Sequence, residues 1–321
     1  MPKLVSMPPQ NDRYRAIAAR LQSDVPDLRV VVAETQEDAR RELPDADAVF
    51  GRIPPELLPL ATNVRWLQAP AAAPPAGFYY EALAEHPLIA CNMRGIFDDH
   101  ISHLILLYVL ALGRGLPYYM EAQRERRWDE DARKHGYVDL GQATALIVGV
   151  GGIGHETARL CHEFGLRVIG VDQRWEYDPP HVERHDPEDL DSLLPKADFV
   201  IVTTPHTPQT EGMWNRQRFA LMKPEAYFIN IGRGLTTRLD DLVAALSDGQ
   251  IAGCALDVFE IEPLPADHPL WTMPNVILTP HIASYQAESV NERYYGVLVD
   301  NARRFVAGKP LRNVVDKALW F

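Results

Sequence analysis

Three side chains with complementary chemistry follow short apolar runs in the second half of the chain: Arg233, Glu262 and His281. An arginine can donate two parallel hydrogen bonds to a carboxylate and polarise a neighbouring carbonyl group. A histidine titrates near neutrality and can pass a proton to or from an oxygen atom. A glutamate that bonds the other ring nitrogen fixes the tautomer of that histidine and favours its charged form. These residue types are suited to proton transfer at a carbonyl beside a bound carboxylate.

A glycine-rich segment upstream predicts the second reactant. Glycines in the pattern G-x-G-x-x-G, at Gly149, Gly151 and Gly154, follow the apolar run 144–148. The first glycine permits a tight strand-to-helix turn, the second lets the backbone approach a pyrophosphate, and the third lets helix and strand pack closely. The helix that follows directs free N–H groups at the pyrophosphate. Asp172 ends the next apolar run and can accept a hydrogen bond from a ribose 2′-hydroxyl, so the segment predicts a dinucleotide site.

The carboxyl ends of parallel strands are where ligands of open α/β sheets bind. Because Arg233, Glu262 and His281 each follow a predicted strand of one series, we expect them to meet beside a nicotinamide. That arrangement predicts hydride transfer between the cofactor and the C2 carbonyl of a 2-keto acid. Asp257 is a candidate for a position near the nicotinamide amide. Taken singly, each residue also has an ordinary interpretation as a salt-bridged or loop residue, and Glu260 competes with Glu262 for the acidic role.

Alternating apolar runs and helical patterns predict two doubly wound parallel-sheet α/β domains. Residues 1–97 contain one series of alternating strands and helices, without a glycine motif of the kind at 149–154. In this series the β-branched segment 28–33 is typical of a parallel strand buried on both faces. An amphipathic helix expected over 288–306 has no place in the second series. We therefore predict a flavodoxin-like substrate domain formed by residues 1–97 and 287–321, with a Rossmann NAD-binding domain inserted at 98–286. Six strands are expected in the inserted domain: 144–148, 167–172, 199–203, 226–231, 253–258 and 275–279.

The bulk composition disfavours several classes of protein. The chain has 321 residues, of which 46% are apolar and 24% charged, and its net charge is −12. This charge disfavours a nucleic-acid partner, which requires a basic face. The three cysteines are far apart, which argues for a reducing compartment and against a disulfide framework or a metal site. The first residues do not form a signal peptide, and the longest apolar run, 104–112, is about half of a membrane span, so we expect a cytoplasmic protein without a membrane partner.

Several segments together resemble the D-isomer-specific 2-hydroxyacid dehydrogenase family, and within it the glyoxylate/hydroxypyruvate reductases. The similarity covers most of residues 95–285 and is specific in both order and spacing. It implies that Arg233 binds substrate and that His281 and Glu262 form the proton-transfer pair. The spacing from Asp257 then selects Glu262 rather than Glu260. The matching segments are 149–154, 204–210, 230–234, 256–265, 269–271, 274–276 and 279–283.

The resemblance also implies the wider site and the assembly. It implies a homodimer built around the cofactor domains, with the helix from Asp99 and the arm 114–139 at the interface; a solvated surface excursion is the alternative for that arm. The catalytic residues would be Arg233, Glu262 and His281, and the substrate would contact Arg233, His281, Ala72, Ala73 and Arg52. The cofactor would contact Gly149, Gly151, Gly152, Ile153, Gly154, Asp172, Thr204, Pro205, Thr210, Ile231, Gly232, Arg233, Asp257, His281 and Ala283.

The chain departs from the family pattern in three places. His103 stands near the helix start where relatives usually carry a glutamate, and Phe97 replaces an asparagine of the formate dehydrogenases, which disfavours formate as substrate. The loop that usually binds the substrate carboxylate through a glycine here reads Ala-Ala-Ala-Pro-Pro over 71–75. Because proline has no N–H group, Ala72 and Ala73 would have to donate the hydrogen bonds. Arg52 is a further candidate facing the same substrate.

Two alternatives stay open at the level of sequence. The Asp172 carboxylate favours NAD by repelling a 2′-phosphate, whereas the nearby Arg174 would partly offset that repulsion and admit NADP. The leading functional prediction is an NAD(P)-dependent 2-hydroxyacid dehydrogenase, or 2-keto acid reductase, that acts on a small D-isomer. The alternative is a non-catalytic, NAD-sensing corepressor-like protein on the same fold, for which His281 would have no role in a reaction.

Overall fold

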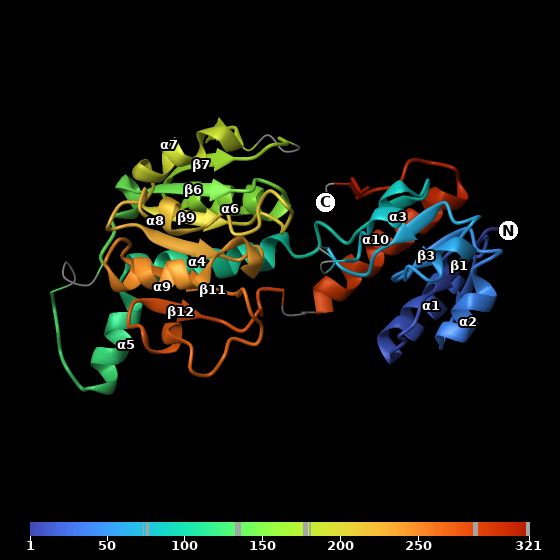
Figure 1. Cartoon of the computed structure of the whole chain (residues 1–321), viewed down its shortest axis with the longest axis horizontal. Coiled ribbons are helices and arrows are strands. Elements are labelled where there is room, and N and C mark those ends of the chain that lie inside the picture. The colour runs from blue at the N-terminus through green and yellow to red at the C-terminus, as the bar shows by residue number, and fades with distance from the viewer. Residues whose placement is uncertain are drawn as a thin grey trace. The chain divides into compact units, whose positions relative to one another are not determined.

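The computed structural model describes residues 1–72, 74, 77–131, 136–175, 179, 181–284 and 288–318. The chain folds into two compact units (Figure 1). Unit 1 comprises Met1–Ile96 and Gln286–Phe321, and unit 2 comprises Phe97–Tyr285. Both are parallel-sheet α/β structures, and unit 2 is inserted into the chain of unit 1. This architecture confirms the predicted fold class.

Unit 1 contains a five-stranded parallel sheet in the order β2-β1-β3-β4-β5, which is the flavodoxin-like order. The interior strand β1 is buried at every position, as expected for a strand covered on both faces. The β-branched run at β2 forms a strand, but the prediction that it is buried on both faces is wrong. Its β-branched residues reflect strand propensity, whereas its place at the sheet edge leaves it partly exposed. The strands are β1 (Lys3–Ser6), β2 (Arg29–Val32), β3 (Ala48–Phe50), β4 (Trp66–Gln68) and β5 (Ile89–Cys91).

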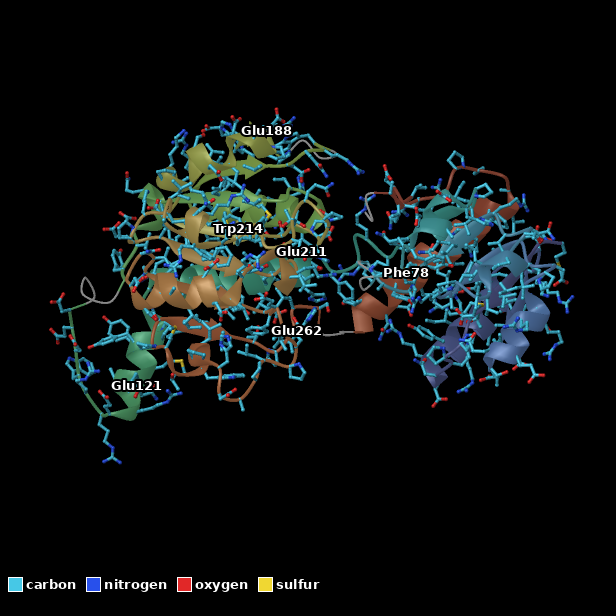
Figure 2. All side chains as sticks on the ribbon, viewed as in Figure 1. Phe78, Glu121, Glu188, Glu211, Trp214 and Glu262 are labelled. Carbon is cyan, nitrogen blue, oxygen red and sulfur yellow. The ribbon has the colours of Figure 1, made fainter. Side chains whose placement is uncertain are left out.

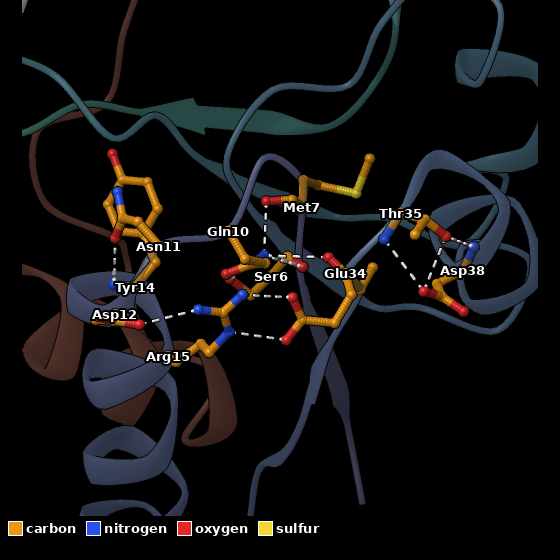
Figure 3. A network of polar contacts seen from close by, with 11 residues as sticks. Ser6, Met7, Gln10, Asn11, Asp12, Tyr14, Arg15, Glu34, Thr35 and Asp38 are labelled. Carbon is orange, nitrogen blue, oxygen red and sulfur yellow. Dashed lines mark hydrogen bonds and ion pairs between the residues drawn. The ribbon is translucent and has the colours of Figure 1, made fainter.

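Side chains cap the first helices of unit 1 and tie them to the strand ends (Figure 3). Thr35 and Asp38 form a reciprocal capping box at the start of α2. Arg15 in α1 donates two hydrogen bonds of 2.9 Å to Glu34, which follows β2. The Gln10 amide donates to the Ser6 carbonyl oxygen at 2.9 Å and so closes the loop after β1. The helices of unit 1 are α1 (Asp12–Asp24), α2 (Gln36–Glu42), η1 (Leu58–Leu60), α3 (Glu81–Glu85) and α10 (Glu288–Val306).

The C-terminal helix α10 belongs to unit 1 and has the bounds predicted from its amphipathic pattern. In Figure 1 this red helix lies among the blue N-terminal elements. The buried Asn301 amide donates to the Gln68 side chain at the end of β4, over 2.9 Å. The Tyr294 hydroxyl donates to the Pro70 carbonyl oxygen at 3.0 Å, in the loop that follows the same strand. The end of the chain therefore supports a loop formed near its beginning.

Unit 2 contains a seven-stranded parallel sheet in the order β12-β11-β10-β9-β6-β7-β8, which is a Rossmann arrangement extended by one strand. Six of these strands match the predicted ones. The edge strand β8 was not predicted, because its sequence Val-Glu-Arg-His has one apolar residue and no buried position. The strands are β6 (Thr144–Val148), β7 (Arg167–Val171), β8 (Val182–His185), β9 (Phe199–Val202), β10 (Tyr227–Asn230), β11 (Gly253–Leu256) and β12 (Val276–Leu278).

The apolar helix α4 (Asp98–Gly113) packs against α6, β10 and β11 and buries half of its residues. The prediction of an arm or loop over 114–139 is partly wrong, because α5 (Leu116–Arg124) forms within it. Pro117 in the first turn favours that helix. The other helices of unit 2 are η3 (Leu140–Gln142), α6 (Gly152–Glu163), η4 (Pro187–Asp189), α7 (Leu190–Leu193), η5 (Leu194–Lys196), α8 (Arg216–Phe219), η6 (Gly234–Thr236), α9 (Leu239–Ser247) and η7 (Pro269–Thr272).

Within the described ranges, no single helix is long and apolar enough to cross a membrane. Only α4 and α5 taken together, which are bent by 66° relative to each other, have that length and composition.

Candidate active site

The glycine motif forms the turn between β6 and α6. Gly149 has φ +95°, and a Cβ atom there would lie 2.9 Å from the Thr204 nitrogen. A Cβ on Gly154 would lie 2.0 Å from the Gly149 carbonyl oxygen, so this position tolerates no side chain. At Gly151, by contrast, a Cβ would meet nothing within 4 Å, so the space before the N-terminus of α6 is open. The turn therefore fits the pyrophosphate of a dinucleotide, as the spacing predicts.

Asp172 follows β7 and lies against this turn. Its Oδ2 atom accepts a hydrogen bond of 2.5 Å from the Val150 nitrogen, and its Oδ1 atom accepts one of 2.7 Å from the Arg174 nitrogen. Both bonds leave acceptor capacity on the carboxylate, which has about four lone-pair sites. Nearby, the buried Thr204 hydroxyl has no hydrogen-bond partner among the described residues. An unsatisfied buried hydroxyl beside the glycine turn is consistent with a polar ligand at this position.

The segment after β9 is a compact turn held by its own hydroxyl groups. The Thr210 hydroxyl donates to the Pro205 carbonyl oxygen at 2.7 Å and accepts from the Thr207 nitrogen at 2.8 Å. His206 contacts the Glu211 carboxylate at 3.1 Å. Thr210 thus shapes the loop, and its predicted contact with the cofactor stays a prediction.

Arg233 is positioned by the buried amide of Asn230 at the end of β10. The Asn230 Oδ1 atom accepts from the Gly232 nitrogen at 2.9 Å, and its Nδ2 atom donates to the Arg233 carbonyl oxygen at 3.2 Å. The Thr236 hydroxyl donates to the same carbonyl oxygen at 2.7 Å. Burial lowers the pKa of the Arg233 guanidinium, and the negative charge of Glu262 opposes that shift. The guanidinium stays charged at neutral pH because its ordinary pKa is far higher.

Glu262 and His281 are in contact after β11 and β12. The Glu262 Oε2 atom lies 2.8 Å from His281 Nδ1, and its Oε1 atom accepts from the Phe259 nitrogen at 2.9 Å. Glu260 lies elsewhere: its carboxylate accepts from the Leu239 nitrogen at 3.1 Å, at the start of α9. Figure 2 labels Glu262 at the same end of unit 2 as Glu211, which follows β9. The choice of Glu262 over Glu260 therefore agrees with the geometry.

Asp257 is completely buried directly after β11. Its carboxylate accepts from the Ile282 and Ala283 nitrogens at 2.9 Å each and from the Thr279 hydroxyl. These bonds hold the turn around His281, and the predicted position of Asp257 near the nicotinamide amide stays a prediction. Tyr108, which bonds Thr279, was missed. A tyrosine within the apolar stretch 104–112 of α4 was the one signal for it, because a buried hydroxyl needs a partner.

A second carboxylate lies beside the glycine turn. Asp98, in the first turn of α4, approaches α6 so closely that a Cβ on Gly152 would lie 2.3 Å from Asp98 Oδ2. Gly152 is the first residue of α6, so a negative charge stands at the helix end that would face the pyrophosphate. This contact could not be predicted from the sequence, since the two residues belong to different helices.

The predicted substrate residues of unit 1 lie on loops that follow two of its strands. Arg52, after β3, is exposed and donates to the Gly77 carbonyl oxygen at 3.2 Å. Ala72, after β4, is half-buried, and Ala73 lies outside the described residues. Among the described residues, no group of three or more His, Cys, Asp or Glu side chains is arranged to hold a metal ion.

The comparison with known proteins agrees with this geometry. Residues 106–283 match the family profile described as D-isomer specific 2-hydroxyacid dehydrogenase, NAD binding domain. The chain belongs to this family. A glyoxylate reductase of Thermofilum pendens is 32% identical over 79% of this chain and 77% of its own length. A glyoxylate/hydroxypyruvate reductase B of Yersinia pestis is 32% identical over 83% of this chain and 82% of its own length.

A solved structure supports the same assignment. A D-isomer specific 2-hydroxyacid dehydrogenase of Xanthobacter autotrophicus Py2, in complex with NADPH and MES, superposes with a TM-score of 0.84 at 27% identity and covers 100% of this chain and 99% of its own. The predicted family and enzyme class are thus confirmed. This member of the D-isomer specific 2-hydroxyacid dehydrogenase family is an NAD(P)-dependent oxidoreductase that acts on CH–OH groups.

Proposed function

We propose that this enzyme reduces a small 2-keto acid to the D-2-hydroxy acid and that His281 donates the proton. The observation that carries the proposal is the 2.8 Å contact between His281 Nδ1 and the Glu262 carboxylate. An ionised carboxylate only accepts hydrogen bonds, so a Glu262 carboxylate in this contact requires a hydrogen on His281 Nδ1. The other ring nitrogen, Nε2, is then free to donate its proton when the ring is charged.

Each residue of the set has a defined task in this proposal. Arg233 binds the substrate carboxylate through its guanidinium fork and polarises the adjacent carbonyl oxygen. His281 Nε2 gives its proton to that oxygen, and Glu262 stabilises the charged ring before the transfer. When bound, the reduced nicotinamide supplies the hydride to C2. The keto group becomes a hydroxyl group, and His281 is left neutral.

The cofactor would be held by the glycine turn, the N-terminus of α6 and the Thr204–Thr210 loop. NADH is the expected cofactor because Asp172 adds negative charge where a 2′-phosphate would bind. Arg174 beside it leaves NADPH as the second choice, and the relative from Xanthobacter autotrophicus Py2 was solved with NADPH. Unit 2 is thus proposed as the cofactor domain and unit 1 as the substrate domain, with Arg52, Ala72 and Ala73 as substrate contacts.

The proposed assembly is a cytoplasmic homodimer. Several large apolar side chains on α4, α5 and the following segment are exposed, and a second copy of the chain would cover them. They are Leu107, Leu116, Met120 and Trp128, whose side chains are 54%, 44%, 48% and 89% exposed.

A substrate panel tests the proposed reaction. The purified protein is mixed with NADH or NADPH and one of glyoxylate, hydroxypyruvate, pyruvate or a bulkier 2-keto acid, and the loss of the reduced cofactor is followed. The names of the relatives favour glyoxylate and hydroxypyruvate. We expect consumption of at least one keto acid, a D-configured product wherever C2 is chiral, and faster turnover with NADH. Tight NADH binding without consumption of any keto acid would reject the proposal.

A further inference from the structure

A continuous set of hydrogen bonds connects helix α4 to the turn that carries His281. The Tyr108 side chain, 1% exposed, hydrogen-bonds the Thr279 hydroxyl, which in turn donates to Asp257 Oδ1. The same carboxylate accepts from the backbone nitrogens of Ile282 and Ala283 at 2.9 Å each. Tyr108 is thereby linked, through the Thr279 hydroxyl and the Asp257 carboxylate, to both residues that directly follow His281.

The direction of these hydrogen bonds follows from the donors available. A carboxylate only accepts, so the single hydroxyl hydrogen of Thr279 is directed at Asp257. Thr279 then has no hydrogen left for Tyr108, so the Tyr108 O–H group must be the donor to Thr279. Hydrogen bonds in such a series polarise and strengthen one another in a buried environment. Removing the Tyr108 hydroxyl would therefore weaken the bond between Thr279 and Asp257 as well as the one it makes itself.

The turn depends on this support because its backbone is strained. His281 has φ +54°, in the left-handed region that residues other than glycine rarely adopt. Its nitrogen donates to the Thr279 carbonyl oxygen at 3.0 Å, which closes a tight turn. Such conformations persist only where the surroundings over-determine them. Here the Asp257 carboxylate holds the turn from both sides, through Thr279 before His281 and through Ile282 and Ala283 after it.

We propose that Tyr108 is a positioning residue for the reaction, acting through Thr279 and Asp257 to fix the backbone of His281. The proposal rests on the proposed function, in which His281 transfers the proton. A positioned acid loses rate steeply when it is displaced by fractions of an ångström. Tyr108 lies in α4, which belongs to unit 2 as His281 does, so one helix of this unit is proposed to align the proton donor of the same unit.

The test compares two single-hydroxyl deletions, Tyr108→Phe and Tyr227→Phe. Tyr227 is a matched control because it belongs to the same apolar cluster, is 5% exposed and donates one hydrogen bond, of 3.0 Å, to the Gly136 carbonyl oxygen. It lies at the start of β10, at the opposite end of the strands from His281. Both variants lose one buried hydrogen bond, so a general loss of stability affects them equally.

We expect Tyr108→Phe to lower kcat by roughly 10- to 100-fold while the KM for NADH changes less than about twofold. Hydrogen exchange of the amides over 279–284 should accelerate in this variant, because their clamp is weakened. Tyr227→Phe should leave both quantities at the wild-type value. A parallel pair at Thr279 tests the link itself: Thr279→Val should reproduce the loss, and Thr279→Ser, which keeps the hydroxyl, should restore most of it.

The outcomes separate this inference from the proposed function. If the wild-type enzyme reduces keto acids but Tyr108→Phe matches Tyr227→Phe in kcat, Tyr108 is only structural and the inference is overturned. Unchanged exchange over 279–284 in Tyr108→Phe overturns it as well, whatever the activity. If the wild-type protein reduces no keto acid, the proposed function fails and the positioning role fails with it. In that case, faster hydrogen exchange over 279–284 in Tyr108→Phe would show only that Tyr108 stabilises the turn, without a role in catalysis.

Discussion

The side chain of Glu262 makes two hydrogen bonds, and each restricts the surroundings of His281. One oxygen accepts from the Phe259 nitrogen, which fixes the carboxylate, and the other contacts His281 Nδ1. With that ring nitrogen occupied, Nε2 is the one available for an external oxygen atom. Glu260, two positions earlier, uses its carboxylate at the start of α9 instead. At the scale of single residues, neighbouring acids of the same type thus have separate tasks.

Because Glu262 and Glu260 have separate partners, the same change from glutamate to glutamine should have different effects at the two positions. Glu262→Gln removes the negative charge that favours the charged imidazole, so we expect kcat to fall about 10- to 100-fold, with a greater loss at neutral than at acidic pH. Glu260→Gln keeps an oxygen that accepts from Leu239 and should change kcat less than about twofold. Steady-state rates across the pH range compare the two. Equal losses in both variants would contradict the assigned pairing.

At the scale of secondary-structure elements, the helices α4 and α6 meet beside the glycine turn. Ser102 in α4 donates to the Ile153 carbonyl oxygen at 3.1 Å and accepts from the Thr157 hydroxyl at 3.2 Å, both in α6. These bonds hold the helices close together, and the approach brings Asp98 against Gly152. A pyrophosphate held as proposed at the N-terminus of α6 would therefore add its negative charge beside that of Asp98.

This arrangement predicts that Asp98 weakens cofactor binding. Replacing it with asparagine removes the repulsion at nearly constant shape, so we expect the Kd for NADH to fall about three- to tenfold, with a larger effect at low salt. Asp99→Asn is the control, because Asp99 has the same charge in the same helical turn and caps His100 instead. Fluorescence titration with NADH measures both variants. Weaker binding in Asp98→Asn would show that the carboxylate supports the cofactor.

The sequence predicts best those elements whose apolar residues recur at a regular spacing or whose turn residues form a recognisable motif. The glycine motif, six strands of unit 2 and helix α10 follow from apolar spacing and from turn residues, which act locally. β8 was missed and β2 was assigned too much burial because both are edge strands, where the sheet environment rather than the local sequence decides exposure. Helix α5 was missed because charged residues interrupt its apolar pattern.

At the scale of the whole molecule, the candidate site consists of short loops at the ends of strands that are distant in sequence. Arg233, Glu262 and His281 could be named from the sequence because each lies in the loop that follows a strand, a position that carries ligands in this fold. It could not find Tyr108, which lies 171 residues from its partner Thr279. Periodicity tells which face of a helix is buried but not which distant hydroxyl it meets. The supporting contacts therefore appear only in three dimensions.

The most direct test of the central claim is the effect of His281→Ala on the reduction of the preferred keto acid, measured alongside NADH binding. We expect kcat to fall by about two to four orders of magnitude, while the Kd for NADH changes less than about threefold. His162→Ala serves as the control, because His162 is an exposed histidine in the last turn of α6, away from the glycine turn. A His281→Ala variant that keeps kcat within about tenfold of the wild-type value would contradict the assignment of His281 as the proton donor.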